Sequence, residues 1–268
     1  MKRFFGKVLR RLSRYFLEET NEHEWFYGNF QSWKDALNEC EGYDSPNILN
    51  QVKKSLLKVK SGEAIYERDS VLFDRIEYSF PLLTGLLYAA ASSSGRLSVL
   101  DFGGSLGSSY FQNRTFMDKL SFFRWSIVEQ THFVEEGIKN FQDENLKFYH
   151  TASECVSTEK PNVLILSSSL PYLCNPYEIL ESLLSHGIPY IIIDRTPFFL
   201  DENPDRILIE RVPPEIYDAR YPIWFFNEKK FLEFMDSKYS LKEEFLAIDP
   251  LGIKGENTKY KAFIFVKR

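Results

Sequence analysis

The sequence predicts an α/β protein built on a doubly wound, mostly parallel sheet. Three observations lead to this fold class. Short apolar runs alternate with helix-length segments over residues 97–194, a pattern typical of parallel strands joined by right-handed crossovers. The runs 163–166 and 191–193 lack polar alternation, as in strands covered on both faces. A glycine-rich turn follows the first run, where this fold class binds ligands.

The elements follow from these runs in chain order. The predicted parallel strands are 97–102, 125–129, 146–149, 162–167 and 190–194. The predicted helices between them are 106–119, 133–141 and 176–186. After Pro197 a Pro-, Tyr- and Trp-rich stretch extends to about residue 226 and a helix follows over 228–235. Two long strands, 241–248 and 260–267, face each other across a Pro- and Gly-containing turn and suit an antiparallel pair at one edge.

The chain before residue 96 is predicted to be mainly helical. Ser32 can cap a helix with its own hydroxyl, Pro46 can open another, and Phe80-Pro81 opens an apolar stretch. The predicted organisation is therefore a basic helix over 1–17, a helical cap region over 18–95 and a main domain over 96–268, with an insertion at about 198–226.

Composition excludes several classes of function. The 268 residues are 44% hydrophobic and carry a formal net charge of −5, which supports a globular fold and argues against nucleic acid as a partner. Three cysteines form no close pair and four histidines show no metal-ligand spacing, so we expect a reduced, cytoplasmic protein and no metal. No apolar run reaches the roughly 20 residues that span a bilayer.

The first 16 residues form a basic amphipathic pattern. Six Lys and Arg residues precede any acid, while apolar residues recur at helical spacing. Such a helix can lie on an anionic membrane surface, here through residues 2–16, or dock on the protein body or on a second subunit. Peripheral contact with the inner membrane and a homodimer are thus both left open.

The turn after the first strand contains the main binding motif. Asp101, Gly103, Gly104, Ser105 and Gly107 form an Asp-x-Gly-x-x-x-Gly pattern. The dinucleotide fingerprint requires a glycine where this chain has a serine at position 108. The pattern instead resembles the first motif of class I S-adenosylmethionine-dependent methyltransferases. A tight strand-to-helix turn without a ligand is the structural alternative.

A second acid, Glu129, ends the next predicted strand and is followed by Gln130. A carboxylate at this position can accept hydrogen bonds from the two hydroxyls of a ribose. Taken alone, Glu129 could be a solvated loop residue, but after Asp101 and the glycines we interpret it, with Gln130, as cofactor-binding.

The fourth and fifth strand ends supply the remaining polar candidates. Ser168 is predicted to contact the cofactor and Arg195 the substrate, because carboxyl ends of parallel strands border the ligand crevice. Methyl transfer to a hydroxyl needs one base to remove its proton. The candidates are His132, Asp194 and Tyr172; His132 could equally cap a helix, and Asp194 could pair with Arg195.

As a whole, the chain resembles a family of methyltransferases found in bacterial surface-polysaccharide (capsule and O-antigen) gene clusters. The segments that carry the resemblance are 43–46, 66–70, 99–113, 128–130, 193–198 and 212–218. The resemblance implies a Rossmann-like seven-stranded sheet with an antiparallel last strand, S-adenosylmethionine as cofactor, and a sugar or sugar-linked acceptor such as a sugar phosphate or nucleotide sugar.

The resemblance also implies roles outside the sheet. Tyr66 and Arg68 could fold over the cofactor, although an ion pair among residues 67–69 is an equal alternative. Aromatic faces suit sugar rings, so four residues of the insertion are predicted to bind substrate, with a packed core as the alternative. These residues are Tyr217, Asp218, Tyr221 and Trp224.

The sequence therefore predicts a cytoplasmic S-adenosylmethionine-dependent methyltransferase that O-methylates a sugar or sugar-linked precursor of surface polysaccharide. Two rival interpretations remain open. One is a nucleotide-sugar oxidoreductase on a similar sheet, and the other is a non-catalytic protein that keeps the cofactor pocket as a scaffold.

Overall fold

The computed structural model describes residues 25–40, 46–212 and 219–268. The predicted helix over 1–17 and the candidates Tyr217 and Asp218 lie outside these residues. The chain divides into two compact units, each built from separate stretches of sequence. The first comprises Met1–Ile76, Pro197–Lys229 and Ile248–Tyr260, and the second comprises Glu77–Thr196, Lys230–Ala247 and Lys261–Arg268.

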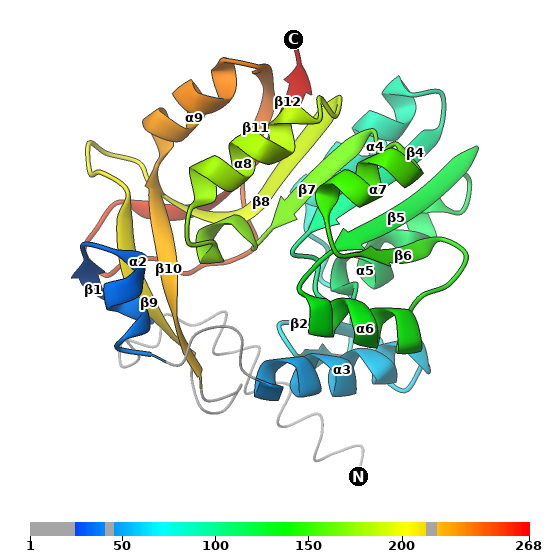
Figure 1. Cartoon of the computed structure of the whole chain (residues 1–268), viewed down its shortest axis with the longest axis horizontal. Helices are drawn as coiled ribbons and strands as arrows, with labels where there is room; N and C mark the ends of the chain where they lie inside the picture. Colours follow the sequence, from blue (N-terminus) through cyan, green and yellow to red (C-terminus); the bar gives the residue numbers. More distant parts are fainter. Residues whose placement is uncertain (1–24, 41–45, 213–218) are drawn as a thin grey trace. The chain divides into compact units, whose positions relative to one another are not determined.

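The second unit contains the predicted parallel sheet. Its strands are β4 (Arg96–Phe102), β5 (Phe122–Val128), β6 (Leu146–Tyr149), β7 (Val163–Ser167) and β8 (Tyr190–Phe199). They lie side by side in the order β8-β7-β4-β5-β6, every neighbouring pair parallel (Figure 1). The order reverses between β4 and β7, as it does in doubly wound folds.

Two further strands complete the sheet beyond β8. β11 (Tyr239–Leu246) and β12 (Thr258–Lys267) pair antiparallel, and β12 also pairs with β8. The amide of Lys267 donates to the carbonyl of Pro189, just before β8 begins, so β12 runs opposite to β8. Among the described residues of the second unit this makes seven strands with an antiparallel last strand, and β10, β9 and β1 extend the hydrogen-bonded sheet to ten strands. The predicted Rossmann-like fold class is confirmed.

Helices cover both faces of this sheet. α4 (Phe80–Ser92), α5 (Ser108–Met117) and α6 (Thr131–Asn140) share one face, while α7 (Ala152–Glu159) and α8 (Pro176–Ser185) lie on the face toward the viewer in Figure 1. Two glycines allow close approach on the first face. A Cβ on Gly85 of α4 would lie 2.6 Å from Ile192 of β8, and one on Gly137 of α6 would lie 2.4 Å from Phe148 of β6.

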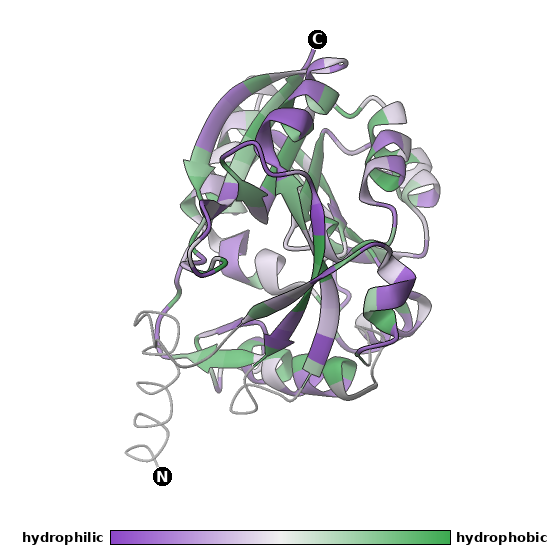
Figure 2. Ribbon diagram, turned by 90° about the vertical axis from the view of Figure 1, so that its left-hand side faces the viewer, coloured by the Kyte–Doolittle hydropathy of each residue, from purple (hydrophilic) through white to green (hydrophobic). Residues whose placement is uncertain are grey.

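The core follows the predicted apolar runs. Residues 163–166 of β7 and 191–193 of β8 are fully buried, as expected of strands with helices on both faces. The helix ribbons carry both green and purple turns in Figure 2, because each buries one side and exposes the other. No helix in the described part of the chain has the length and apolarity to cross a bilayer.

The first unit is built around an antiparallel three-stranded arrangement. β1 (Phe26–Phe30) pairs with β9 (Arg206–Val212), which pairs with β10 (Ala219–Asn227). The last two residues of β8 pair with the end of β10. The unit also contains α2 (Trp33–Leu37), α3 (Pro46–Lys60) and a hairpin of β2 (Tyr66–Arg68) with β3 (Val71–Phe73).

Several boundaries differ from the sequence prediction. The mainly helical region expected before residue 96 also contains the strands β1, β2 and β3. β1 pairs with β9, which is far away in the sequence, and β2 pairs with β3 across a tight turn. The stretch after Pro197 forms β9 and β10, and β8 continues past Asp194 to Phe199. α7 was not predicted; the Thr151 hydroxyl caps it by accepting from the amide of Glu154. The predicted helix start at Ser32 is confirmed, since its hydroxyl accepts from the amide of Asp35.

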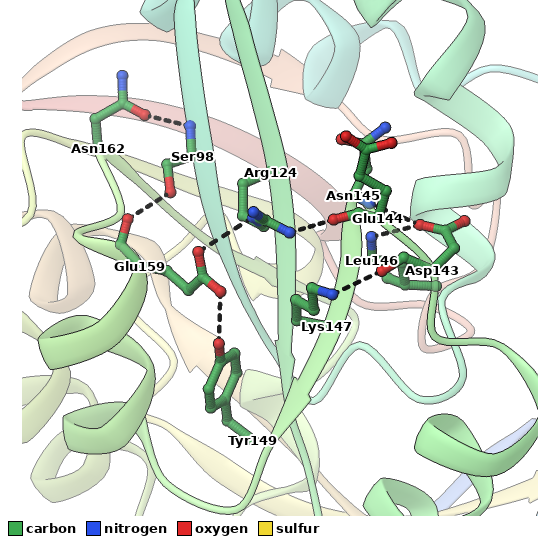
Figure 3. A network of polar contacts seen from close by, with 10 residues as sticks. All are labelled: Ser98, Arg124, Asp143, Glu144, Asn145, Leu146, Lys147, Tyr149, Glu159 and Asn162. Atoms are coloured by element: carbon green, nitrogen blue, oxygen red, sulfur yellow. Dashed lines mark hydrogen bonds and ion pairs between the residues drawn. The ribbon is translucent and has the colours of Figure 1, made fainter.

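A polar network joins α7 to the strands beneath it (Figure 3). Glu159, at the end of α7, forms an ion pair with Arg124 of β5 at 3.1 Å and accepts from the Tyr149 hydroxyl of β6 at 2.6 Å. Its backbone carbonyl accepts from the Ser98 hydroxyl of β4 at 3.0 Å. Because the Glu159 and Arg124 side chains are largely buried, the loss of one partner leaves the other poorly solvated.

We therefore expect Glu159→Gln to lower the free energy of unfolding by about 1–3 kcal/mol, since it removes the charge that pairs with Arg124. Urea denaturation at pH 7 measures the change. Glu154→Gln is the matched control, because Glu154 is exposed on the same helix and should change stability by less than about 0.5 kcal/mol. Equal stabilities for the two variants would contradict the role of the network.

Candidate functional site

The carboxyl ends of four neighbouring strands of the second unit bring most of the candidate residues together. Asp101 lies in β4, Glu129 directly follows β5, Ser168 follows β7 and Asp194 lies in β8. The strand register places Asp101 and Asp194 on the same face, because Asp101 is level with Ile165, Ile165 is level with Ile192, and Asp194 is two residues further on. This is the face that carries α4 and α5.

The glycine loop, residues 103–107, alternates left-handed and ordinary backbone. Gly103, Ser105 and Gly107 have φ values of +73°, +54° and +106°. The Gly103 amide donates to the carbonyl of Val128 at 2.9 Å and the Gly107 amide to that of Gly104 at 3.0 Å. Gly107 is the residue immediately before α5, so the loop leads from the end of β4 directly to a helix N-terminus.

Asp101 lies beneath this loop. It is 1% exposed, and its Oδ2 accepts from the indole Nε1 of Trp125 at 2.9 Å. A Cβ on Gly104 would lie 2.6 Å from this carboxyl group, so only glycine fits there without movement. Burial raises the pKa of Asp101 from 3.8 to about 7; the Trp125 hydrogen bond opposes the rise and the charge of Glu129 adds to it.

Glu129 connects the end of β5 to the glycine loop. One carboxylate oxygen accepts from the Gln130 amide at 2.7 Å. Burial raises the pKa of Glu129, while backbone hydrogen bonds from Gln130 and Ser105 and the charge of His132 lower it. His132 is half-buried in the first turn of α6, so the structure brings this candidate base close to Glu129.

The end of β7 is level with Asp194 of β8. This residue is fully buried, and its Oδ2 accepts from the hydroxyls of Ser79 at 2.9 Å and Ser167 at 3.2 Å. Its backbone carbonyl accepts from the amide of Ser168 at 3.0 Å. Tyr172 lies in the short 3-10 helix η1 (Leu170–Tyr172) that follows, and is half-buried.

Two serine hydroxyls point to a ligand at this edge. The Oγ atoms of Ser105 and Ser169 are buried and have no hydrogen-bond partner among the described residues. Ser169 also lies against the glycine loop, since a Cβ on Gly103 would be 2.6 Å from its Cβ. Buried hydroxyls normally form hydrogen bonds. Two buried hydroxyls without a partner, next to the backbone of the glycine loop, therefore fit a polar ligand with its own donors and acceptors, such as a nucleoside bearing an amino acid.

Apart from Arg195, the remaining described candidates belong to the first unit. Arg68 lies over the ring of Phe73 at 5.3 Å and is 4.0 Å from the carboxylate of Asp69. Tyr66 packs against the same ring at 5.6 Å. Trp224 is stacked between Trp33 and Phe226, at 6.3 Å from each.

The insertion aromatics are also packed within this unit. Tyr221 is 4% exposed on β10. Arg195, in the second unit, is half-buried and has a φ of +51°.

Three contributors to the site were not singled out in the sequence. Trp125 is inside a strand run, and only the register of β4 and β5 shows that it reaches Asp101. Ser79 carries a weak signal, because a serine before Phe-Pro is typical of a helix N-cap. Ser169 belongs to the serine run that ends β7. In the described residues no three His, Cys, Asp or Glu side chains are grouped so as to hold a metal ion.

Comparisons with known proteins were made for the sequence and for the fold. No family model and no curated protein matches the sequence. Among solved structures, a similar one is an S-adenosylmethionine-dependent methyltransferase from Clostridium acetobutylicum, with a TM-score of 0.43 and 10% identity over 71% of this chain and 92% of that chain.

Two further solved structures are similar. The glycopeptide N-methyltransferase MtfA complexed with S-adenosylmethionine has a TM-score of 0.48 and 10% identity over 71% of this chain and 96% of that chain. The N-terminal domain of EvdMO1, in the presence of S-adenosylhomocysteine and D-fucose, has a TM-score of 0.45 and 9% identity over 80% and 96%. At these identities the likeness concerns the fold alone.

We expect Asp101→Asn to flatten the pH dependence of stability. With its pKa raised to about 7, the carboxyl group stays protonated in the folded protein while it ionises in the unfolded chain. The contribution of the protonated Asp101 to the free energy of unfolding is fully present below about pH 4. It is lost as pH rises through about 7, by up to about 4 kcal/mol. Urea unfolding between pH 5 and 8 should show that the stability of the variant rises relative to that of the wild type as the pH increases. A constant difference across this range would contradict the raised pKa.

Gly104→Ala should destabilise the protein by about 1–3 kcal/mol, because the new methyl group meets the Asp101 carboxyl group. The control is the same substitution in an Asp101→Ala background, where the obstructing atoms are gone and the cost should be smaller. Unfolding of all four proteins completes a double-mutant cycle. If the changes in the free energy of unfolding are additive, the methyl group at position 104 does not clash with the Asp101 carboxyl group.

Proposed function

We propose that this protein is an S-adenosylmethionine-dependent methyltransferase whose cofactor binds at the carboxyl ends of β4, β5 and β7. The observation that carries the proposal is the junction of the glycine loop with Glu129. There the backbone of Ser105 meets the acid that follows the next strand. The hydroxyl of Ser105, within the loop, and that of Ser169, which lies against Gly103, are both buried and unsatisfied.

Glu129 is the residue proposed to hold the ribose. Its carboxylate already accepts from backbone amides on one side, which orients it and leaves further lone pairs for two vicinal hydroxyls. Each charge-assisted hydrogen bond in such a shielded place contributes about 1.5–3 kcal/mol. Gln130 follows at the start of α6 and is proposed to line the same end of the site.

The glycine loop is proposed to hold the amino-acid end. Gly103 and Gly104 keep side chains away from the ligand. Asp101 beneath them supplies negative charge toward an ammonium group, because a bound cation favours ionisation of this carboxyl group. Ser105, Gly107 and Ser168 lie on the same edge. The bound cofactor would supply an activated methyl group on a positively charged sulfur.

The protein's remaining task is to orient the acceptor and to remove its proton. His132 and Tyr172 are half-buried, so a bound acceptor can reach them, and we propose them as the candidate bases. Asp194 is enclosed by two serine hydroxyls, which suits it less to that task.

The acceptor is proposed to be a sugar or a sugar-linked precursor of surface polysaccharide, methylated on oxygen. The aromatic content of the first unit supports a sugar, since aromatic faces pack against the apolar faces of sugar rings. Arg195, in the second unit, is proposed to contact it. Tyr66, Arg68, Tyr221 and Trp224 lie in the first unit, and their roles toward the cofactor and the acceptor stay predictions from the sequence.

Calorimetric titration with S-adenosylhomocysteine tests the proposal. We expect binding by the wild type and an affinity at least about tenfold weaker for Glu129→Ala, because the ribose hydroxyls lose their acceptor. Glu135→Ala is the matched control, since Glu135 is exposed on the adjacent helix α6, and it should bind like the wild type.

A wild-type protein that does not bind S-adenosylhomocysteine would overturn the proposed function. Methyl transfer from S-adenosylmethionine to a panel of sugar nucleotides and sugar phosphates then tests the acceptor class. Binding without transfer to any sugar would contradict the sugar assignment.

A further inference from the structure

Ser79 occupies a helix N-cap position without capping the helix. It directly precedes α4, and its side chain makes no hydrogen bond to the helix amides. Its hydroxyl instead donates to Asp194 Oδ2 at 2.9 Å, and the residue is 3% exposed. A serine placed this way gives up the usual stabilisation of a cap, so its contact with Asp194 calls for a separate explanation.

The helix α4, which begins directly after Ser79, packs closely on β8. Gly85, on α4, packs so closely on Ile192 that a Cβ would lie 2.6 Å from that side chain. Ile192 and Asp194 are two residues apart on one strand and therefore share a face. The close contact at Gly85 thus fixes the height of α4 above the sheet and with it the position of Ser79 over Asp194.

Asp194 in turn holds the segment that leaves β7. Its side chain accepts from the hydroxyl of Ser167, its partner in the parallel ladder, and its carbonyl accepts from the Ser168 amide. Ser168 has a φ of +54°, a left-handed conformation that is uncommon for a residue with a side chain.

The held segment ends at the proposed cofactor and acceptor site. Ser169 packs against Gly103 of the glycine loop, and its carbonyl accepts from the amide of Tyr172 at 3.1 Å. A continuous series of contacts therefore leads from Ser79 through Asp194 to the glycine loop and to Tyr172.

We propose that Ser79 and Asp194 are positioning residues, which hold residues 168–172 in the conformation that the cofactor and the acceptor require. This inference rests on the proposed function for its purpose, but the positioning itself is a property of the protein alone. It assigns Asp194 a role different from that of a general base, because neither residue needs to touch a reacting atom.

Amide hydrogen exchange of the full chain tests the positioning directly. In Ser79→Ala, the amides of Ser168 and Tyr172 should exchange at least about tenfold faster than in the wild type, because the carboxylate that orders this segment has lost a donor. Asp194→Ala should have a larger effect. Asp194→Asn, which keeps an acceptor oxygen, should restore part of the protection.

Ser98→Ala is the matched control. Ser98 is also fully buried and donates one hydrogen bond, to the carbonyl of Glu159, so its loss should destabilise the protein to a similar extent. It should leave the exchange of residues 168–172 unchanged. Equal acceleration in Ser79→Ala and Ser98→Ala would overturn the proposal, because the effect would then be global.

Titration with S-adenosylhomocysteine separates this inference from the proposed function. If the wild type binds, Ser79→Ala should weaken binding by about three- to tenfold, while Ser98→Ala should not, and equal affinities for all three proteins would overturn a positioning role toward the cofactor. If the wild type does not bind, the proposed function fails, and the positioning of residues 168–172 stands or falls with the exchange data.

Discussion

The contact between the Asp101 carboxyl group and Gly104 is the constraint on which the site depends. It places a buried acid directly beneath the loop, at a position where the loop has no room for a side chain. The indole of Trp125 fixes the acid from the neighbouring strand. The loop then leads its backbone past Glu129 and Ser169 and into α5. Any larger residue at position 104 would have to displace either the loop or the acid.

Burying this acid opposes stability. Its raised pKa means that the folded protein resists ionisation of Asp101 near neutral pH, and the nearby Glu129 experiences the same penalty from burial. Proteins tolerate such groups where function uses the charge. A cationic ligand group beside Asp101 would relieve this cost, so the residues that weaken the free protein are those that would strengthen a complex.

A second buried acid, Asp194, lies on the same face of the sheet, but its surroundings differ. Two serine hydroxyls donate to its Oδ2, one from Ser79, directly before α4, and one from Ser167 at the end of β7, whereas the indole of Trp125 donates to Asp101. The contrast separates an acid that orders protein segments from one that faces the glycine loop. The same sheet edge thus combines the two proposed positioning residues with the proposed ligand site.

Much of the second unit could be predicted because its signals are local. The uninterrupted apolar run of β7 indicates a strand covered on both faces, and the spacing of Asp101 and the glycines indicates a strand-to-helix turn whatever surrounds it. β1 and β9 could not be placed in this way. β1 pairs with β9, which is far away in the sequence, and the aromatic residues of the predicted insertion also suit antiparallel strands.

By itself the sequence determined the fold class, the order of the five parallel strands along the chain and the acids at the ends of β4 and β5, because these depend on periodicity and on short spacings. Only the tertiary structure decided which side chains meet. Trp125 and Ser79 reach their carboxylates through strand register and through the packing of α4 on β8. Contacts between residues 24 and 115 positions apart leave no periodic trace in the sequence, since nothing in the local chain depends on them.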